Sequence, residues 1–210
     1  MMYYPTQYTV WDLETSGLDP VNDRILEIGA VRVNSDGTKE EMSWLLKYPG
    51  FQVSETTVNL TGITQEEIEE HGEDPNKALQ EFLVFIEGRQ GGDVFPNVTH
   101  NGYRFDIPFL ESFVLRSIPE KYRGNYISGI RRGMLDTAVL YKAQKLGDPR
   151  RWYESFDDYA QRIMAIRAYG VKYNIPLCCE ELGIDTSNAV FHRALGDATL
   201  TNEIYKKLCL

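Results

Sequence analysis

The chain has 210 residues, enough for one sizeable hydrophobic core and few for two. Hydrophobic residues make up 42% and charged residues 25%, which is ordinary globular usage and excludes wholesale disorder. The net charge of −9 excludes a protein held to nucleic acid by bulk positive charge alone, although it allows an enzyme whose carboxylates surround metal ions. We therefore expect a single domain over residues 1–210.

The sequence predicts a cytoplasmic protein without membrane contact. No apolar run approaches the ~18–20 residues that a bilayer span needs. The first residues, MMYYPTQYTV, lack the basic start and apolar core of a secretory signal. The three cysteines are odd in number and lack metal-ligand spacing, so we expect reduced thiols at Cys178, Cys179 and Cys209.

The first predicted elements are strands. Residues 8–14, 25–33 and 41–47 are apolar or alternate between apolar and polar. A turn-forming segment, NSDG at 34–37, separates the second and third, so the three strands should form an antiparallel meander. A further strand is predicted over 93–99, where Pro96 indicates a sheet edge or a bulge.

Helices dominate the rest of the chain. Thr64 and Glu67 have the spacing of a capping box that opens a short helix. Apolar periodicity predicts a helix from Pro75 to about Gly88, whose QEFLVF segment resembles a sliding-clamp-binding peptide but should belong to the core. Further helices are predicted over 107–117, 135–146, 155–168 and from Ala194 towards the C-terminus. This order indicates an α/β fold, a mixed central sheet flanked by helices.

Asp12 and Glu14 are the first residues with catalytic chemistry. On a strand, residues i and i+2 point to the same face, so these two carboxylates project together. Two close carboxylates resist ionising together unless a cation neutralises them, and hard divalent ions such as Mg²⁺ or Mn²⁺ take such oxygen ligands. Because a single Asp-x-Glu is a weak signal, a purely structural pair at the core edge is the alternative.

Two later segments carry further carboxylates. The segment HNGYRFD at 100–106 places Asp106 at the start of an apolar helix, where its alternative role is an N-cap. The segment HRALGDA at 192–198 places His192 and Asp197 five residues apart. That spacing brings the two side chains to one face only if His192 precedes or starts the helix, and the alternative is an ordinary helix surface.

In this order the three segments resemble the DEDDh family of 3′→5′ exonucleases. That family includes the proofreading subunit of bacterial replicative polymerases, RNase T, oligoribonuclease and the three-prime repair exonucleases. The resemblance covers nearly the whole chain, from DLETSGL at 12–18 through EIGA at 27–30 to the final helix. HNGYRFD is most similar to the three-prime repair exonucleases, and HRALGDA to the bacterial proofreading exonucleases. The four residues between His192 and Asp197 match the histidine branch of the family, because the tyrosine branch has three.

The resemblance implies an RNase-H-like exonuclease fold in which four carboxylates hold two Mg²⁺ or Mn²⁺ ions. Two metal ions can position a water molecule and stabilise the leaving oxygen of a phosphodiester, and imidazole suits a general base at neutral pH. The implied products are nucleoside 5′-monophosphates released from a 3′ end. By motif matching, the metal ligands are Asp12, Glu14, Asp106 and Asp197, and His192 accepts the proton of the attacking water.

The resemblance also implies substrate contacts. Thr15 and Leu18 match residues that contact the terminal nucleotide; otherwise Thr15 would end a strand and Leu18 would fill the core. Asn101 and Arg104 either bind substrate or brace the loop before the second motif's aspartate. The pair Asp136-Thr137 matches a family pattern for which we expect a structural role.

Basic residues concentrate in 111–175, which holds twelve Lys and Arg against seven Asp and Glu, with aromatic residues interspersed. The pattern fits either a solvated surface or a contact with a polyanion. The 86 positions from Asp106 to His192 exceed the spacing expected of compact family members. We therefore predict a helical insertion near 145–170 that flanks the substrate groove, with Arg150 and Arg151 as candidate phosphate contacts.

Together these features predict a metal-dependent 3′→5′ exonuclease, with DNA as the favoured substrate. Its partner should be a nucleic acid with a free, single-stranded 3′ end, and a polymerase or another replication or repair protein is a further candidate. The alternatives are an exoribonuclease that trims RNA ends and a non-catalytic nucleic-acid-binding or polymerase-associated subunit. Because a binding subunit would not need all five motif residues, their presence favours the enzyme.

Overall fold

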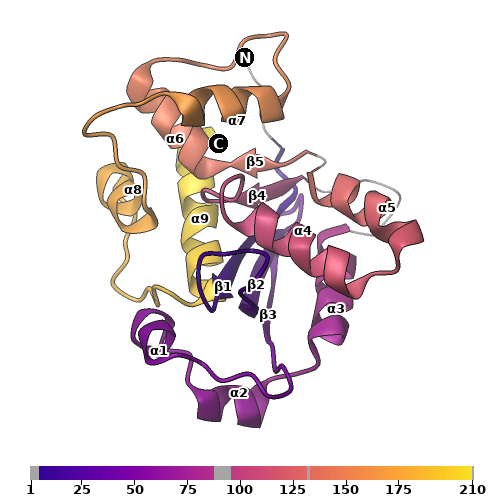
Figure 1. Ribbon diagram of the computed structural model, residues 1–210. Coiled ribbons are helices and arrows are strands. Elements are labelled where there is room, and N and C mark those ends of the chain that lie inside the picture. Colours follow the sequence, from indigo (N-terminus) through magenta and orange to yellow (C-terminus); the bar gives the residue numbers. More distant parts are fainter. Residues whose placement is uncertain (1–4, 88–95, 132, 210) are drawn as a thin grey trace.

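The computed structural model describes residues 5–87, 96–131 and 133–209 (Figure 1). Its centre is a five-stranded sheet in the order β3-β2-β1-β4-β5. The strands β1, β2 and β3 form the predicted antiparallel meander, and β4 and β5 are parallel to β1. The strands are β1 (Tyr8–Thr15), β2 (Ile25–Val33), β3 (Lys39–Leu45), β4 (Asn97–Thr99) and β5 (Leu135–Asp136). The predicted mixed sheet is therefore confirmed.

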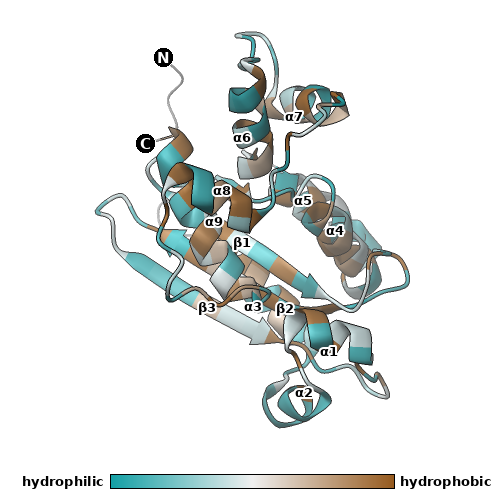
Figure 2. Ribbon diagram, turned by 90° about the vertical axis from the view of Figure 1, so that its left-hand side faces the viewer, coloured by the Kyte–Doolittle hydropathy of each residue, from teal (hydrophilic) through white to brown (hydrophobic). Residues whose placement is uncertain are grey.

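Helices surround this sheet and carry the later motifs (Figure 1). They are α1 (Glu55–Thr61), α2 (Gln65–His71), α3 (Pro75–Glu87), α4 (Asp106–Ser117), α5 (Glu120–Arg131), α6 (Thr137–Leu146), α7 (Phe156–Ala165), α8 (Ile175–Leu182) and α9 (Ala194–Cys209). Figure 2 shows apolar residues on the central strands and on parts of α4 and α9. No helix in the described ranges is both long and apolar enough to cross a membrane.

The two faces of β1 pack against different helices, because side chains alternate along a strand. Trp11 and Leu13 belong to a core cluster with residues of α3, α4 and α5. Tyr8 and Val10 belong to a second cluster, which includes residues of α9. By the same alternation, Asp12 and Glu14 lie on the α9 side of the sheet.

Gly29 brings α9 close to this side of the sheet. It pairs with Asp12 across the β1–β2 ladder. A Cβ atom at position 29 would lie 2.1 Å from the backbone nitrogen of Leu195 and 2.2 Å from the carbonyl carbon of Ala194. Only glycine leaves room for this contact, so the first turn of α9 lies directly over the strand pair.

Several elements differ from their predictions. Residues 135–136 form β5, so the predicted helix over 135–146 begins at Thr137, and the predicted helix over 155–168 ends at Ala165. Helices α1, α5 and α8 were not predicted. α5 contains two glycines and buries only Ile130 among its described side chains, which leaves no apolar periodicity to detect. α8 does carry end signals, an Asn174 N-cap and a left-handed Gly183 C-cap.

The prediction that Pro96 marks a sheet edge or a bulge was wrong. β4 lies between β1 and β5, and Pro96 directly precedes it. The Pro96 carbonyl accepts a 3.0 Å hydrogen bond from the Thr9 amide. Proline is tolerated there because a residue at the start of a strand need not donate a backbone hydrogen bond to the neighbouring strand. Only 97–99 of the predicted strand 93–99 are in β4, and residues 93–95 lie outside the described residues.

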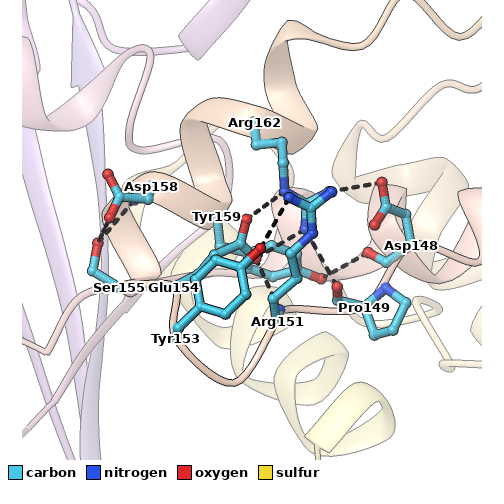
Figure 3. Close-up of polar contacts among 9 residues, drawn as sticks. All are labelled: Asp148, Pro149, Arg151, Tyr153, Glu154, Ser155, Asp158, Tyr159 and Arg162. Atoms are coloured by element: carbon cyan, nitrogen blue, oxygen red, sulfur yellow. Dashed lines mark hydrogen bonds and ion pairs between the residues drawn. The ribbon is translucent and has the colours of Figure 1, made fainter.

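The segment 145–170 contains α7 and a folded loop before it, so it is helical in part. Figure 3 shows the Arg162 guanidinium directed between Glu154 and Asp148, which it contacts at 3.0 and 2.7 Å. This ion pairing ties the loop back onto α7 and holds the pKa of Glu154 well below its usual range. Arg162 is therefore engaged within the segment itself.

Candidate active site

Three separate segments bring the four predicted carboxylates together. Asp12 and Glu14 come from β1, Asp106 is the first residue of α4, and Asp197 lies in the first turn of α9. The Asp106 Oδ1 atom accepts a 3.2 Å hydrogen bond from the amide of Leu13, which fixes Asp106 beside β1. The N-cap of α4 is Phe105, without a side-chain cap, so the alternative N-cap role of Asp106 is not observed.

His192 lies against two of these carboxylates. A ring nitrogen of His192, a carboxylate oxygen of Glu14 and a carboxylate oxygen of Asp197 all lie within 4.8 Å of one another. His192 precedes α9, in the left-handed region with φ of 59°. Its amide donates a 3.3 Å hydrogen bond to Asp197 Oδ2. The condition for His192 and Asp197 to meet, a histidine ahead of the helix, is therefore fulfilled.

Burial raises the pKa values of all four carboxylates, and the charges of neighbouring carboxylates raise them further. The pKa of Asp12 lies well above its usual range. Burial is the largest cause, and the charges of the other three carboxylates raise this pKa further. Burial and neighbouring carboxylates also raise the pKa of Glu14 and of Asp106 to about 8. Burial raises the pKa of Asp197 to about 6. Each of these groups acts on another, so the four form one electrostatic cluster.

This cluster fits a hard divalent cation. Asp197 Oδ1 is buried and has no hydrogen-bond partner among the described residues. Burying several carboxylates without a positive charge costs free energy, which a bound cation would offset. The carboxylate oxygens of the cluster are donors that suit Mg²⁺ or Mn²⁺.

An ion pair from β2 holds the segment that carries His192. The Arg193 guanidinium binds both carboxylate oxygens of Glu27, at 3.0 and 2.8 Å, and Glu67 of α2 at 2.9 Å. Glu27 also accepts a 2.9 Å hydrogen bond from the Ala194 amide at the start of α9. Glu27 and Arg193 both lie in the quoted motifs EIGA and HRALGDA, but no role was predicted for either; the available signal was a glutamate within the apolar run ILEIGAVRV.

A second set of hydrogen bonds shapes the loop before Asp106. The Asp136 carboxylate accepts from the amides of Asn101 and Tyr103, at 2.9 and 3.2 Å, and also caps α6. Thr137 donates to the Thr99 carbonyl at 3.1 Å. These contacts confirm the structural role expected of the Asp136-Thr137 pair.

The remaining predicted residues lie around this centre. Thr15 is buried and bonds the Gly17 carbonyl at 2.7 Å, while Leu18 is 84% exposed, so Leu18 does not fill the core. Arg104 bonds the Met164 carbonyl at 2.6 Å, which braces its loop against the end of α7. Asn101 has a left-handed φ of 62°, and its buried Oδ1 has no hydrogen-bond partner among the described residues.

Residues 9–205 match the exonuclease family RNase_T. The matched residues include both edge strands of the sheet, β3 and β5, and every residue of the cluster described above. The chain belongs to this exonuclease family. The predicted resemblance to DEDDh exonucleases is thereby confirmed.

Relatives of this exonuclease domain include bacterial DNA polymerase III proteins. It is 30% identical over 207 residues to the DNA polymerase III subunit epsilon of Aquifex aeolicus, covering 96% of this chain and 79% of the relative. It is 29% identical over 198 residues to the PolC-type DNA polymerase III of Thermotoga maritima, covering 94% of this chain. There the chain spans only 11% of the relative's length.

The fold is also that of Escherichia coli exonuclease I. A structure of that enzyme in complex with a dT13 oligonucleotide superposes with a TM-score of 0.70 over 96% of this chain and 40% of the other. The sequence identity is 20%. The RNase-H-like exonuclease fold predicted from the motifs is therefore confirmed.

Removing the Arg193 ion pair should destabilise the exonuclease domain. In Arg193→Met, the buried Glu27 would lose its positive partner, which should lower the free energy of unfolding by about 1–3 kcal/mol. Adding Glu27→Gln should restore part of this loss. Thermal unfolding of both single variants and the double variant measures the coupling, and losses that simply add would show that the pair does not act as a unit.

Without metal, the domain should lose stability as the pH rises from about 5 to 9. The folded-state pKa values of Glu14 and Asp106 are raised, so protonation of these groups favours the folded state and their ionisation opposes it. Added Mg²⁺ or Mn²⁺ should reverse the trend, since metal binds the ionised carboxylates. Thermal unfolding in EDTA and with metal, across this pH range, tests the prediction; a pH-independent difference between the two would contradict it.

Proposed function

We propose that this chain is a metal-dependent 3′→5′ exonuclease that hydrolyses the terminal phosphodiester bond of DNA and releases nucleoside 5′-monophosphates. The observation that carries the proposal is the convergence of four carboxylates and one histidine from β1, α4 and the start of α9. Membership of the exonuclease family supports it.

Asp12, Glu14, Asp106 and Asp197 would hold two Mg²⁺ ions, or Mn²⁺ in their place. When bound, the ions supply positive charge for the scissile phosphate and lower the pKa of a coordinated water. The carboxylates bind metal in their ionised forms. Because these ionised groups repel one another, a bound cation stabilises them best. A zinc-bound form of the exonuclease I complex with single-stranded DNA has been solved, which supports a metal at this fold's site.

His192 accepts the proton of the attacking water in this proposal. It is the exposed member of the cluster, so its ring can lose the proton to solvent afterwards. The charge of His192 and the hydrogen bond from its amide lower the pKa of Asp197, which opposes the effect of burial and favours the ionised carboxylate. The fixed backbone at φ of 59° keeps the ring beside the carboxylates.

Thr15 and Leu18 are proposed to contact the terminal nucleotide. Leu18 is exposed next to the end of β1, where an apolar side chain can pack against a base or sugar. Asn101 is the other proposed substrate contact, because its buried amide oxygen lacks a partner among the described residues. The Arg104 contact with Met164 favours bracing over substrate binding for that residue.

DNA is the favoured substrate because the relatives are DNA polymerase subunits and exonuclease I was solved with DNA oligonucleotides. By the same argument a single-stranded 3′ end is the preferred form, and a polymerase is the candidate protein partner in proofreading. An exoribonuclease would use the same cluster, and it would differ in tolerating the 2′-hydroxyl group.

A 5′-labelled single-stranded oligonucleotide, offered as DNA and as RNA with Mg²⁺, Mn²⁺ or EDTA, tests the function. A product ladder that shortens from the 3′ end only with metal would support the proposal, and the faster sugar would identify the substrate. Binding without cleavage under every metal condition would favour the non-catalytic subunit instead.

A further inference from the structure

A pocket of about 500 Å³ opens directly beside His192 and Asp197. Its other walls are His100 and Asn101 after β4, Phe191, and the segment 171–176 that leads into α8. The volume lies within the range of about 300–1,000 Å³ typical of ligand sites. No residue of β1 or of the turn with Thr15 and Leu18 lines it, so it is distinct from the proposed terminal-nucleotide contacts.

The walls of this pocket carry the chemistry of nucleotide recognition. Lys172 supplies a cation, Phe191 and Tyr173 supply aromatic surface, and the Asn101 Oδ1 atom is a buried acceptor without a partner in the described ranges. Cations neutralise phosphates and rings stack on bases in single-strand binding. Carboxylates are absent from the part of the lining contributed by 171–176.

Most other Lys and Arg side chains described in 111–175 form ion pairs or hydrogen bonds, whereas Lys172 does not. Arg131 pairs with Glu111, Lys145 with Glu181, and the buried Lys142 bonds the Ile166 carbonyl at 2.8 Å. Lys172 is exposed and makes no hydrogen bond or ion pair with any described residue. Arg150 and Arg151, the phosphate contacts expected from the sequence, do not line this pocket.

The segment that carries Lys172 is anchored at the pocket. The buried His100 ring contacts the Tyr173 carbonyl through Nε2 and the Thr137 hydroxyl through Nδ1, the latter at 2.8 Å. Asn174 caps α8 through a 3.0 Å hydrogen bond from the Leu177 amide. Lys172 therefore projects from a backbone that is held at the two residues directly after it, as a positioned binding group requires.

We propose that this pocket binds the nucleotide on the 5′ side of the scissile phosphate, with Lys172 contacting its phosphate and Phe191 packing against its base. The proposal rests on the exonuclease function proposed above. It assigns the bound strand a direction, from this pocket towards the residues proposed to contact the terminal nucleotide, Thr15 and Leu18. It also makes 171–176, rather than 148–154, the part of the basic block that touches substrate.

The test compares Lys172→Glu with Lys172→Arg and with Lys207→Glu, an equal charge change at an exposed site in the last turn of α9. The probe is a single-stranded dT12 whose terminal linkage is a hydrolysis-resistant phosphorothioate, followed by fluorescence anisotropy with Mg²⁺. Lys172→Glu should raise Kd about 10-fold or more, and should reduce the slope of log Kd against log salt by about 0.7. Lys172→Arg and Lys207→Glu should bind like the wild type.

Kinetics separate this pocket from the chemical step. With unmodified dT12, Lys172→Glu should raise KM in proportion to Kd with kcat nearly unchanged. The p-nitrophenyl ester of thymidine 5′-monophosphate lacks a second nucleotide, so the Lys172→Glu deficit should vanish with it. Equal affinities and KM values for the two Glu variants would overturn the proposal, as would a wild type that does not bind dT12. If the affinity difference is found but no variant hydrolyses any substrate, the pocket stands and the proposed exonuclease function fails.

Discussion

Asp12→Asn should reduce hydrolysis by about 10³–10⁵-fold while leaving the protein folded. Asp12 interacts electrostatically with every other carboxylate of the cluster, so its loss removes a ligand from the centre of the site. Metal ions contribute several kcal/mol of transition-state stabilisation, and each 1.36 kcal/mol is tenfold in rate. Single-turnover hydrolysis of a 5′-labelled oligonucleotide at saturating Mn²⁺ measures the effect.

The same variant should be more stable than the wild type when metal is absent. Burial and four neighbouring carboxylates raise the pKa of Asp12, so ionised Asp12 opposes folding and neutral asparagine does not. In EDTA at pH 8 we expect a rise of a few degrees in Tm, where ~1 kcal/mol corresponds to about 2–4 °C. At pH 5 the difference should shrink. An unfolded or strongly destabilised variant would show that Asp12 has a structural role instead.

His192→Ala should lower the rate by about 10²–10⁴-fold, the usual contribution of a general base. Metal affinity should stay close to that of the wild type, because the four carboxylates remain. The loss should diminish at high pH, where hydroxide becomes available without a base. Initial rates across pH 6 to 10, together with metal titration followed by thermal unfolding, distinguish a base from a ligand.

His71→Ala is the matched control for this variant. His71 lies exposed in the last turn of α2, outside the cluster of four carboxylates and His192. Its removal should leave the rate and the pH profile unchanged. Wild-type turnover in His192→Ala would contradict the assigned role, and a loss of metal-dependent stabilisation would indicate that His192 is a metal ligand.

The positions of the proposed metal ligands on their strand and helices were predictable because they depend on local structure. Alternation along a strand is enough to place Asp12 and Glu14 on one face, and the spacing of the last motif requires only a histidine ahead of α9. The contacts that support them were not predictable. Arg193 and Glu27 are 166 positions apart, and no local pattern specifies such a pair.

The fold shows the same division between local and long-range information. The meander was predictable from alternating apolar residues and a hairpin turn, whereas β5 has two residues and exists only through its pairing with β4. The pocket beside His192 could not be predicted either. α8 was not predicted, and the segment before α8 is held near the end of β4 by a long-range contact between the Tyr173 carbonyl and the His100 ring. Tertiary contacts, rather than propensity, determine these parts.

The missing side chain at Gly29 has a consequence for how this site can change. Asp12 and Glu14 belong to the sheet, and Asp197 belongs to a helix that rests on the backbone of residue 29. Any larger residue there would force the helix outward and widen the gap between Asp197 and the two carboxylates of β1. The spacing of the proposed metal ligands thus depends on a residue that has no functional side chain, so we expect a substitution of Gly29 to impair metal binding as much as the loss of a ligand would.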